Sequence, residues 1–86
     1  MIQRASLHVE VADGSFPHEK VVTFLAGAQK YSLFVDERDV NGRSIDVAVV
    51  AFNGDSVLID LPSDTFTSGS RVWVPRTLLE LDSVAA

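Results

Sequence analysis

Residues 44 to 62 read SIDVAVVAFNGDSVLIDLP, two apolar segments on either side of an Asn-Gly pair. Both segments are rich in β-branched residues, and Asn-Gly is typical of the tight turn between two antiparallel strands. Because side chains alternate along a strand, the inward positions are Ile45, Val47, Val49 and Ala51 in the first segment, and Val57, Ile59 and Leu61 in the second. The stretch therefore predicts a β-hairpin at the centre of an apolar core.

The register of this hairpin follows from the requirement that inward residues of the two strands face each other. A two-residue loop of Asn53 and Gly54 would place apolar residues opposite polar ones along the whole ladder. A three-residue loop that also includes Phe52, with the glycine left-handed before a bulge, brings the apolar residues together. The predicted inward pairs are Val49 with Val57, Val47 with Ile59, and Ile45 with Leu61.

The opposite face of the hairpin is also largely apolar. On that face the same register predicts the pairs Ala48 with Leu58, Val50 with Ser56, and Asp46 with Asp60. A strand that is apolar on both faces is normally covered on both. We therefore expect a second layer of protein over this outer face, from this chain or from another one.

The flanking segments extend the β pattern. Residues 5 to 12, 30 to 35 and 71 to 74 each predict a strand. Residues 19 to 25 favour a strand by composition, with a helix beginning near Pro17 as the alternative, and residues 75 to 81 predict either one helical turn or a last edge strand. The segment VWVPRTLLEL resembles the closing strand, short helical turn and last strand of SH3-like small barrels.

These segments predict an all-β fold. We expect a small antiparallel open barrel or strongly bent sheet of five to six strands, of SH3-like size, with at most one short helix. The resemblance to SH3-like barrels extends to size and local order, and many functions share such folds.

The composition restricts the class of protein. The 86 residues carry a formal net charge of -5, and the seven Lys and Arg residues are scattered, so we expect no nucleic-acid partner. No cysteine is present, which excludes disulfides, thiolate metal ligands and a cysteine nucleophile. The longest uninterrupted apolar run, residues 47 to 52, is too short to span a membrane. We expect a cytoplasmic protein of one domain, residues 1 to 86, with no membrane partner and no cofactor.

The charged stretch DERDVNGRSID, residues 36 to 46, predicts a longer connection in which Val40 turns back toward the core. It also supplies carboxylates to a candidate acidic site, whose members are Asp36, Glu37, Asp46 and Asp60. Such a group suits a weakly bound cation or general acid and base catalysis. An arginine placed between the carboxylates would instead make them a structural ion-pair network.

Trp73 is the residue most informative about function. If Val72 and Val74 face the core, alternation places Arg71 and Trp73 together on the other face, as in many interface anchors; the alternative is that Trp73 is the core residue. The sequence predicts a non-enzymatic interaction module that forms a homo-oligomer, first of all a dimer, or serves a larger protein as an accessory partner. The candidate interface residues are Ala48, Val50, Leu58, Arg71 and Trp73. The alternative is a small enzyme or a ligand or cation sensor that uses the acidic site.

Overall fold

The computed structural model describes residues 3 to 81. Within this range the chain forms strands and two short 3-10 turns, and no α-helix. The strands are β1 (Gln3–His8), β2 (Glu10–Asp13), β3 (Glu19–Ala26), β4 (Gln29–Asp36), β5 (Val40–Asn41), β6 (Ser44–Asn53), β7 (Ser56–Thr65), β8 (Gly69–Pro75) and β9 (Leu79–Leu81); the 3-10 turns are η1 (Glu37–Asp39) and η2 (Arg76–Leu78). No helix among these residues is long and apolar enough to cross a membrane.

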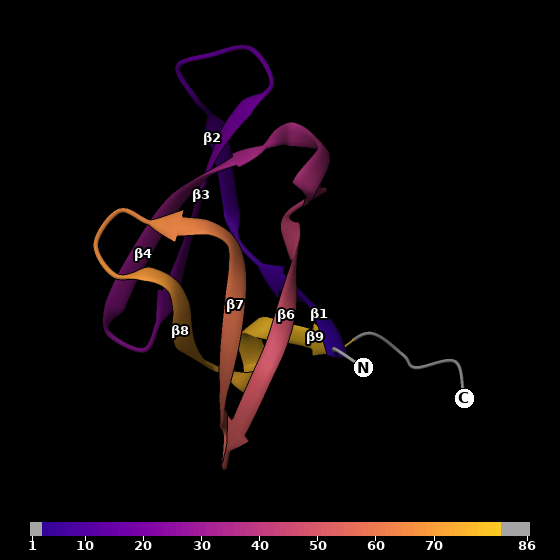
Figure 1. Cartoon of the computed structure of the whole chain (residues 1–86), viewed down its shortest axis with the longest axis vertical. Coiled ribbons are helices and arrows are strands. Elements are labelled where there is room, and N and C mark those ends of the chain that lie inside the picture. Colours follow the sequence, from indigo (N-terminus) through magenta and orange to yellow (C-terminus); the bar gives the residue numbers. More distant parts are fainter. Residues whose placement is uncertain (1–2, 82–86) are drawn as a thin grey trace.

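The strands form one antiparallel sheet that curls into an open half-barrel (Figure 1). Its strand order is β2-β3-β4-β7-β6-β1-β9, with β8 paired to β7 and β5 paired to β6. The predicted fold class is therefore confirmed. The described residues form more strands than the five to six expected, because the segment predicted as one strand over residues 5 to 12 is two strands and because β5 and β9 are short additions.

The chain changes partners at Val9, between β1 and β2. β1 pairs with β6 and β9, whereas β2 pairs with β3 near the other end of the strand order. The Val9 N–H donates to the Arg43 carbonyl oxygen at 2.9 Å, and the Val9 side chain is buried. The alternation of inward and outward side chains continues from β1 into β2 because both strands face the same core. The sequence pattern alone therefore does not show that the strand is divided at Val9.

The two open questions about the flanking segments are settled. Residues 19 to 26 form strand β3, and no helix begins near Pro17. Residues 76 to 81 contain both predicted forms, a 3-10 turn followed by an edge strand. The order strand, short turn and strand expected for VWVPRTLLEL is thus present in β8, η2 and β9.

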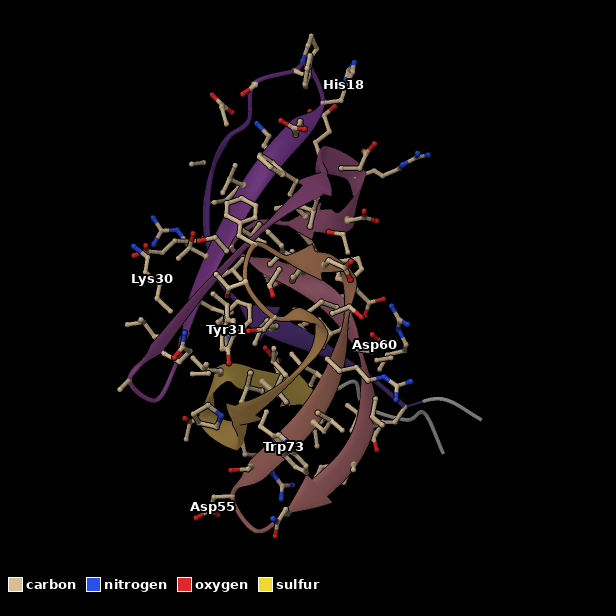
Figure 2. The ribbon with its side chains drawn as sticks, turned by 60° about the vertical axis from the view of Figure 1, so that its left-hand side comes forward. His18, Lys30, Tyr31, Asp55, Asp60 and Trp73 are labelled. Atoms are coloured by element: carbon tan, nitrogen blue, oxygen red, sulfur yellow. The ribbon has the colours of Figure 1, made fainter. Side chains whose placement is uncertain are left out.

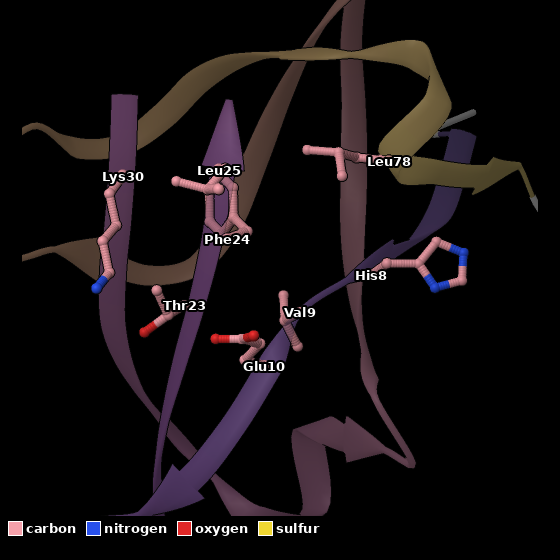
Figure 3. Close-up of a pocket in the computed structure, with 8 residues that line it drawn as sticks. All are labelled: His8, Val9, Glu10, Thr23, Phe24, Leu25, Lys30 and Leu78. Atoms are coloured by element: carbon pink, nitrogen blue, oxygen red, sulfur yellow. The ribbon is translucent and has the colours of Figure 1, made fainter. Parts of the chain in front are cut away.

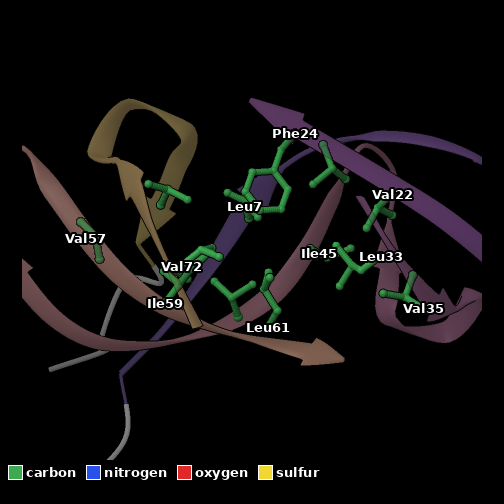
Figure 4. Close-up of a cluster of buried hydrophobic side chains, with 14 residues drawn as sticks. Leu7, Val22, Phe24, Leu33, Val35, Ile45, Val57, Ile59, Leu61 and Val72 are labelled. Carbon is green, nitrogen blue, oxygen red and sulfur yellow. The ribbon is translucent and has the colours of Figure 1, made fainter. Parts of the chain in front are cut away.

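The core fills the concave side of the half-barrel. Its buried side chains are aliphatic except for one phenylalanine and come from six strands and from Val9, and Figure 4 shows Leu7, Phe24 and Val72 converging from three different strands. The buried members are Ala5, Leu7, Val9, Val22, Phe24, Leu33, Val35, Ile45, Val47, Val57, Ile59, Leu61, Val72 and Val74. All the predicted inward residues of the central hairpin belong to this core except Val49, which packs against it, and Ala51.

The predicted register of the central hairpin is wrong. β6 and β7 are joined by a two-residue turn, Gly54 and Asp55, because Asn53 pairs directly with Ser56. Gly54 has a φ of 60°, which fits a tight turn that needs a left-handed residue at its first central position only. Asn53 is therefore the last residue of β6 and lies outside the turn.

A β-bulge at Val50 corrects the parity that this short turn imposes. On the turn side of the bulge Ala51 pairs with Leu58, and on the far side Val49 pairs with Ile59. One extra residue on one strand changes which side chains face each other. The inward residues of the two strands therefore face each other, as predicted. A bulge inside β6 achieves this in place of the predicted longer loop, and the residue pairs differ from the predicted ones.

The bulge overturns four specific predictions. The predicted pair of Ala48 with Leu58 does not form. Ala51 lies opposite Leu58 on the outer face and does not enter the core. Asp60 is opposite Ala48, so the predicted Asp46 and Asp60 pair does not form. Val50 has no direct partner on β7, and Ser56 pairs with Asn53 in its place.

Residues 36 to 46 form the expected charged connection. Asp36 caps η1 by accepting a hydrogen bond from the Arg38 N–H, and the chain then pairs Val40 with Ile45 through the short strand β5. Val40 packs against the core, as predicted. The charged stretch is thus a capped turn followed by a tight hairpin.

Candidate functional site: an exposed patch on the outer face

A row of apolar side chains crosses the outer face of β6, β7 and β8. Ala51 pairs with Leu58, and Leu58 pairs in turn with Trp73, so the three residues lie side by side on one face. Val72 and Val74 are buried, and alternation along β8 therefore turns Trp73 outward. This is the first of the two readings that the sequence allowed.

We call this surface the outer patch; it comprises Ala48, Val50, Ala51, Leu58 and Trp73. Trp73 is 46% exposed and Val50 is 42% exposed, while the other three are half-buried. Neither an α-helix nor a second sheet from residues 3 to 81 covers it. The structure thus brings together the predicted interface residues and adds Ala51, which the bulge moves to this face.

Polar groups border the outer patch along the next row of the sheet. Arg71 pairs with Asp60, which in turn pairs with Ala48, and Ala48 pairs with Arg4 on β1. The Asp60 carboxylate accepts a hydrogen bond from the Ser70 hydroxyl at 3.0 Å. Arg71 is exposed and forms no ion pair with any residue in the described part of the chain. Its guanidinium is therefore available at the edge of the patch.

Asp46 has a separate partner on the same outer face. It lies opposite Ser6, and its Oδ2 accepts a hydrogen bond from the Arg4 Nε at 3.0 Å. The sequence did not identify Arg4 as the partner of this carboxylate, because the pairing of β1 with β6 is a long-range contact. The side chains of this ion pair are 47% and 57% exposed, so its contribution to stability is small.

The other two carboxylates of the candidate acidic site lie in the 36 to 46 connection. Asp36 accepts from the Arg38 N–H at 3.0 Å, and a Glu37 oxygen lies 2.6 Å from the His18 Nδ1. Each of the four candidate carboxylates is thus bonded to a different group. Among residues 3 to 81 there is no cluster of three or more His, Asp or Glu side chains able to hold a metal ion.

His18 and Glu37 form an exposed pair in the turn that leads into β3. His18 has a φ of 67°, an uncommon value for a residue other than glycine, and its carbonyl oxygen accepts from the Glu37 N–H at 2.7 Å. The hydrogen bond to Glu37 raises the pKa of His18, and the negative charges of Glu37 and Asp36 act in the same direction. Figure 2 shows His18 and Trp73 at opposite ends of the molecule.

A second exposed pair lies on the neighbouring strands β2 and β3. The Lys20 Nζ donates to the Asp13 Oδ1 at 2.6 Å. This hydrogen bond lowers the pKa of Asp13 and raises that of Lys20, and the attraction of the two charges adds to both shifts. The two residues are direct partners in the pairing of β2 with β3, and because Asp13 is largely exposed the pair contributes little to stability.

Sequence reasoning missed a second group of exposed aromatic side chains. Phe34 and Phe66 are 46% and 55% exposed, and their ring centroids lie 4.9 Å apart. A shallow groove of about 430 Å³ lies beside Phe34 and extends to Phe16 and Pro62. The alternation of Leu33 and Val35 would have predicted that Phe34 points outward.

Another groove, about 440 Å³, lies between β3 and η2 (Figure 3). Phe24 and Leu78 supply apolar walls, and His8, Glu10 and Lys30 supply polar groups. Figure 3 shows His8 and Glu10 pointing in opposite directions, with Lys30 beyond β3. Because these groups do not converge on one point, the groove lacks the geometry of an acid and base pair.

Comparisons with protein-family models, with curated protein sequences and with solved structures found no significant match to this chain.

Proposed function

We propose that this chain is a small non-enzymatic interaction module that self-associates through the outer patch, most simply as a two-fold dimer. The observation that carries the proposal is the exposure of Trp73, a residue that is 46% exposed and lies beside the apolar Leu58. In a second form of the proposal, the chain binds a larger protein through the same patch as its accessory partner. The proposal also places the protein in the cytoplasm.

The make-up of the outer patch supports binding to protein. Specific interfaces have an apolar centre rich in aromatic residues and a polar rim in which arginine is enriched. Here Trp73 and Leu58 form the centre, and Arg71 and Asp60 lie in the adjacent row. The polar side chains of the groove beside η2 point apart, which favours binding over catalysis as the role of the molecule.

Light scattering at micromolar concentration tests the proposal. The native protein should have the mass of two or more chains, and Leu58→Asp should give monomers or insoluble protein, because a carboxylate would be placed in the apolar centre. A monomer mass for the native protein, with Leu58→Asp leaving mass and melting temperature unchanged, would end the proposal.

A matched pair of variants separates the outer patch from apolar surface in general. Trp73 and Phe34 are both 46% exposed, and they lie on different strands of the sheet. Trp73→Ser should lower the mass to that of one chain, whereas Phe34→Ser should leave the oligomer intact. Equal effects of the two variants would contradict the assignment of the interface to the outer patch.

A further inference from the structure

One edge of β8 has no strand beside it among the described residues. β8 pairs with β7 on one side only, and Figure 1 shows it on the side of β7 opposite β6. The other strands with a single partner are β2, β5 and β9, and all of them are shorter than β8. A long unpaired edge presents free main-chain donors and acceptors to another strand.

The register shows which residues point their main-chain groups outward from this edge. The Arg76 N–H donates to the Asp55 carbonyl oxygen at 2.8 Å, and this pair continues the register of β7 with β8. In an antiparallel ladder hydrogen-bonded pairs alternate with non-hydrogen-bonded pairs. Val74 and Val72 therefore bond to β7, while Arg71 and Trp73 direct their N–H and C=O groups away from it.

The end of the free edge is closed by Pro75. Proline has no N–H, and Pro75 falls in the same alternation as Arg71 and Trp73, so its missing donor would have pointed outward. Proline at such a position limits how far a second strand can add. The open part of the edge is therefore short and centred on Val72.

We propose that a second copy of this chain adds its own β8 to this edge, antiparallel, with Arg71 opposite the partner's Trp73 and Val72 opposite the partner's Val72. This inference rests on the proposed self-association and specifies that the outer patch takes part through Trp73, which Leu58 flanks on β7, and not by the stacking of two outer faces. Both side chains of each Arg71 and Trp73 pair lie on the face that carries the outer patch. The two patches thus join into one surface across the two-fold axis.

The chemistry of the side chains favours this register over the other registers that the two β8 strands could adopt. Hydrogen bonds across the new pair of strands must join residues whose main-chain groups point outward, so Arg71 can face Arg71, Trp73 or Pro75 of the partner. Facing arginines repel each other, and facing Pro75 leaves the Arg71 carbonyl oxygen without a donor. Facing Trp73 places a guanidinium beside an indole ring twice, once for each chain.

A single cysteine tests the register, because the chain has none of its own. In the proposed dimer Val72 and the partner's Val72 form a non-hydrogen-bonded pair with Cα atoms about 4.5 Å apart, within the range that a disulfide spans. Val72→Cys should therefore form a covalent dimer under mild oxidation. Leu58→Cys is the control, because two full strands would separate the two copies of residue 58.

The outcomes distinguish the edge pairing from self-association itself. Crosslinking of Val72→Cys but not Leu58→Cys supports the proposal. Crosslinking of Leu58→Cys alone means that the outer faces stack, which overturns the edge pairing and leaves the proposed function standing. A dimer mass with no crosslink at either position overturns the edge pairing, and a monomer mass for the native protein overturns both.

A measurement on the native protein covers the case in which Val72→Cys does not fold. Amide hydrogen exchange at low and high protein concentration should show that the N–H groups of Arg71 and Trp73 become protected as the dimer forms. The N–H groups of Val11 and Asp13, which point outward from the short edge strand β2 by the same alternation, are the control and should exchange at the same rate at both concentrations. Unchanged exchange of Arg71 and Trp73 in a sample with dimer mass would contradict the proposal.

Discussion

His18 is held in a left-handed backbone conformation, and its ring bonds to a glutamate nineteen positions further along the chain. A Glu37 oxygen lies 2.6 Å from Nδ1, and this bond raises the pKa of His18 above its ordinary value of 6.5. We expect an NMR titration to find that pKa raised, and Glu37→Gln to return it toward 6.5. Glu10→Gln, which removes a distant carboxylate, should leave it in place.

The same pair makes the stability of the fold depend slightly on pH. A raised pKa in the folded state means that protonated His18 stabilises the fold. This contribution is fully present below pH 6.5 and is lost as the pH rises through the raised pKa of His18. Because the His18 and Glu37 side chains are 73% and 48% exposed, solvent screens the pair and the effect is small. Identical pH profiles for the native protein and for Glu37→Gln would contradict this link.

The central hairpin shows what the sequence pattern determines and what it leaves open. Alternation required inward residues of β6 and β7 to face each other, and Val47 and Ile59 are buried as that rule demands. The pattern did not say where parity is adjusted, because a bulge inside β6 and an extra loop residue have the same effect on alternation. The position of the bulge therefore determines which residues share the outer face as neighbours: it places Ala51 in the outer patch and separates Asp46 from Asp60.

Other parts of the candidate site depended on long-range pairing. Trp73 could be assigned to a face as soon as its valine neighbours were known to be inward, and this required only local alternation. The partner of Asp46 is Arg4, forty-two positions away, and no local pattern specifies which strand lies next to which. Most residues of the outer patch could thus be assigned to one face from the sequence, whereas the partners of the candidate acidic residues could not.

The bulge gives a prediction at the level of this hairpin. Deleting Val50 removes the extra residue and leaves the pairs Val49 with Ile59 and Ala51 with Leu58 in a regular ladder. The deletion should therefore fold, with stability lowered by no more than about 2 kcal/mol for the lost bend and side chain. Denaturant unfolding measures the difference.

The matched control is deletion of both Val50 and Ala51. Removing two residues reverses the parity of β6 against β7, so Val47 would point to solvent and Asp46 to the core. This variant should not fold, as judged by the loss of a cooperative unfolding transition. A stable double deletion, or an unfolded single deletion, would contradict the account of the bulge.

Across the whole molecule, stability comes from one apolar core, since the described ion pairs are exposed. Ile59 lies at its centre and has no exposed surface. Ile59→Ala should lower the free energy of unfolding by about 2 to 5 kcal/mol, because it leaves a cavity. Leu25, 58% exposed, is the control, and Leu25→Ala should change that free energy by no more than about 0.5 kcal/mol. Similar losses for both variants would mean that this core is not the source of stability.

The proposed self-association through the outer patch predicts that the stability of the fold depends on protein concentration. A partner that binds only the folded chain stabilises it by mass action, so a dimer melts at a higher temperature when the chain is more concentrated. A hundredfold increase in concentration changes the association term by about 2.7 kcal/mol, enough to raise the melting temperature by several degrees. Trp73→Ser should remove this dependence, because it deletes the aromatic centre of the patch, whereas Phe34→Ser should retain it. Calorimetry at the two concentrations measures the shift, and a native melting temperature that stays constant would show that folding does not depend on a second copy of the chain.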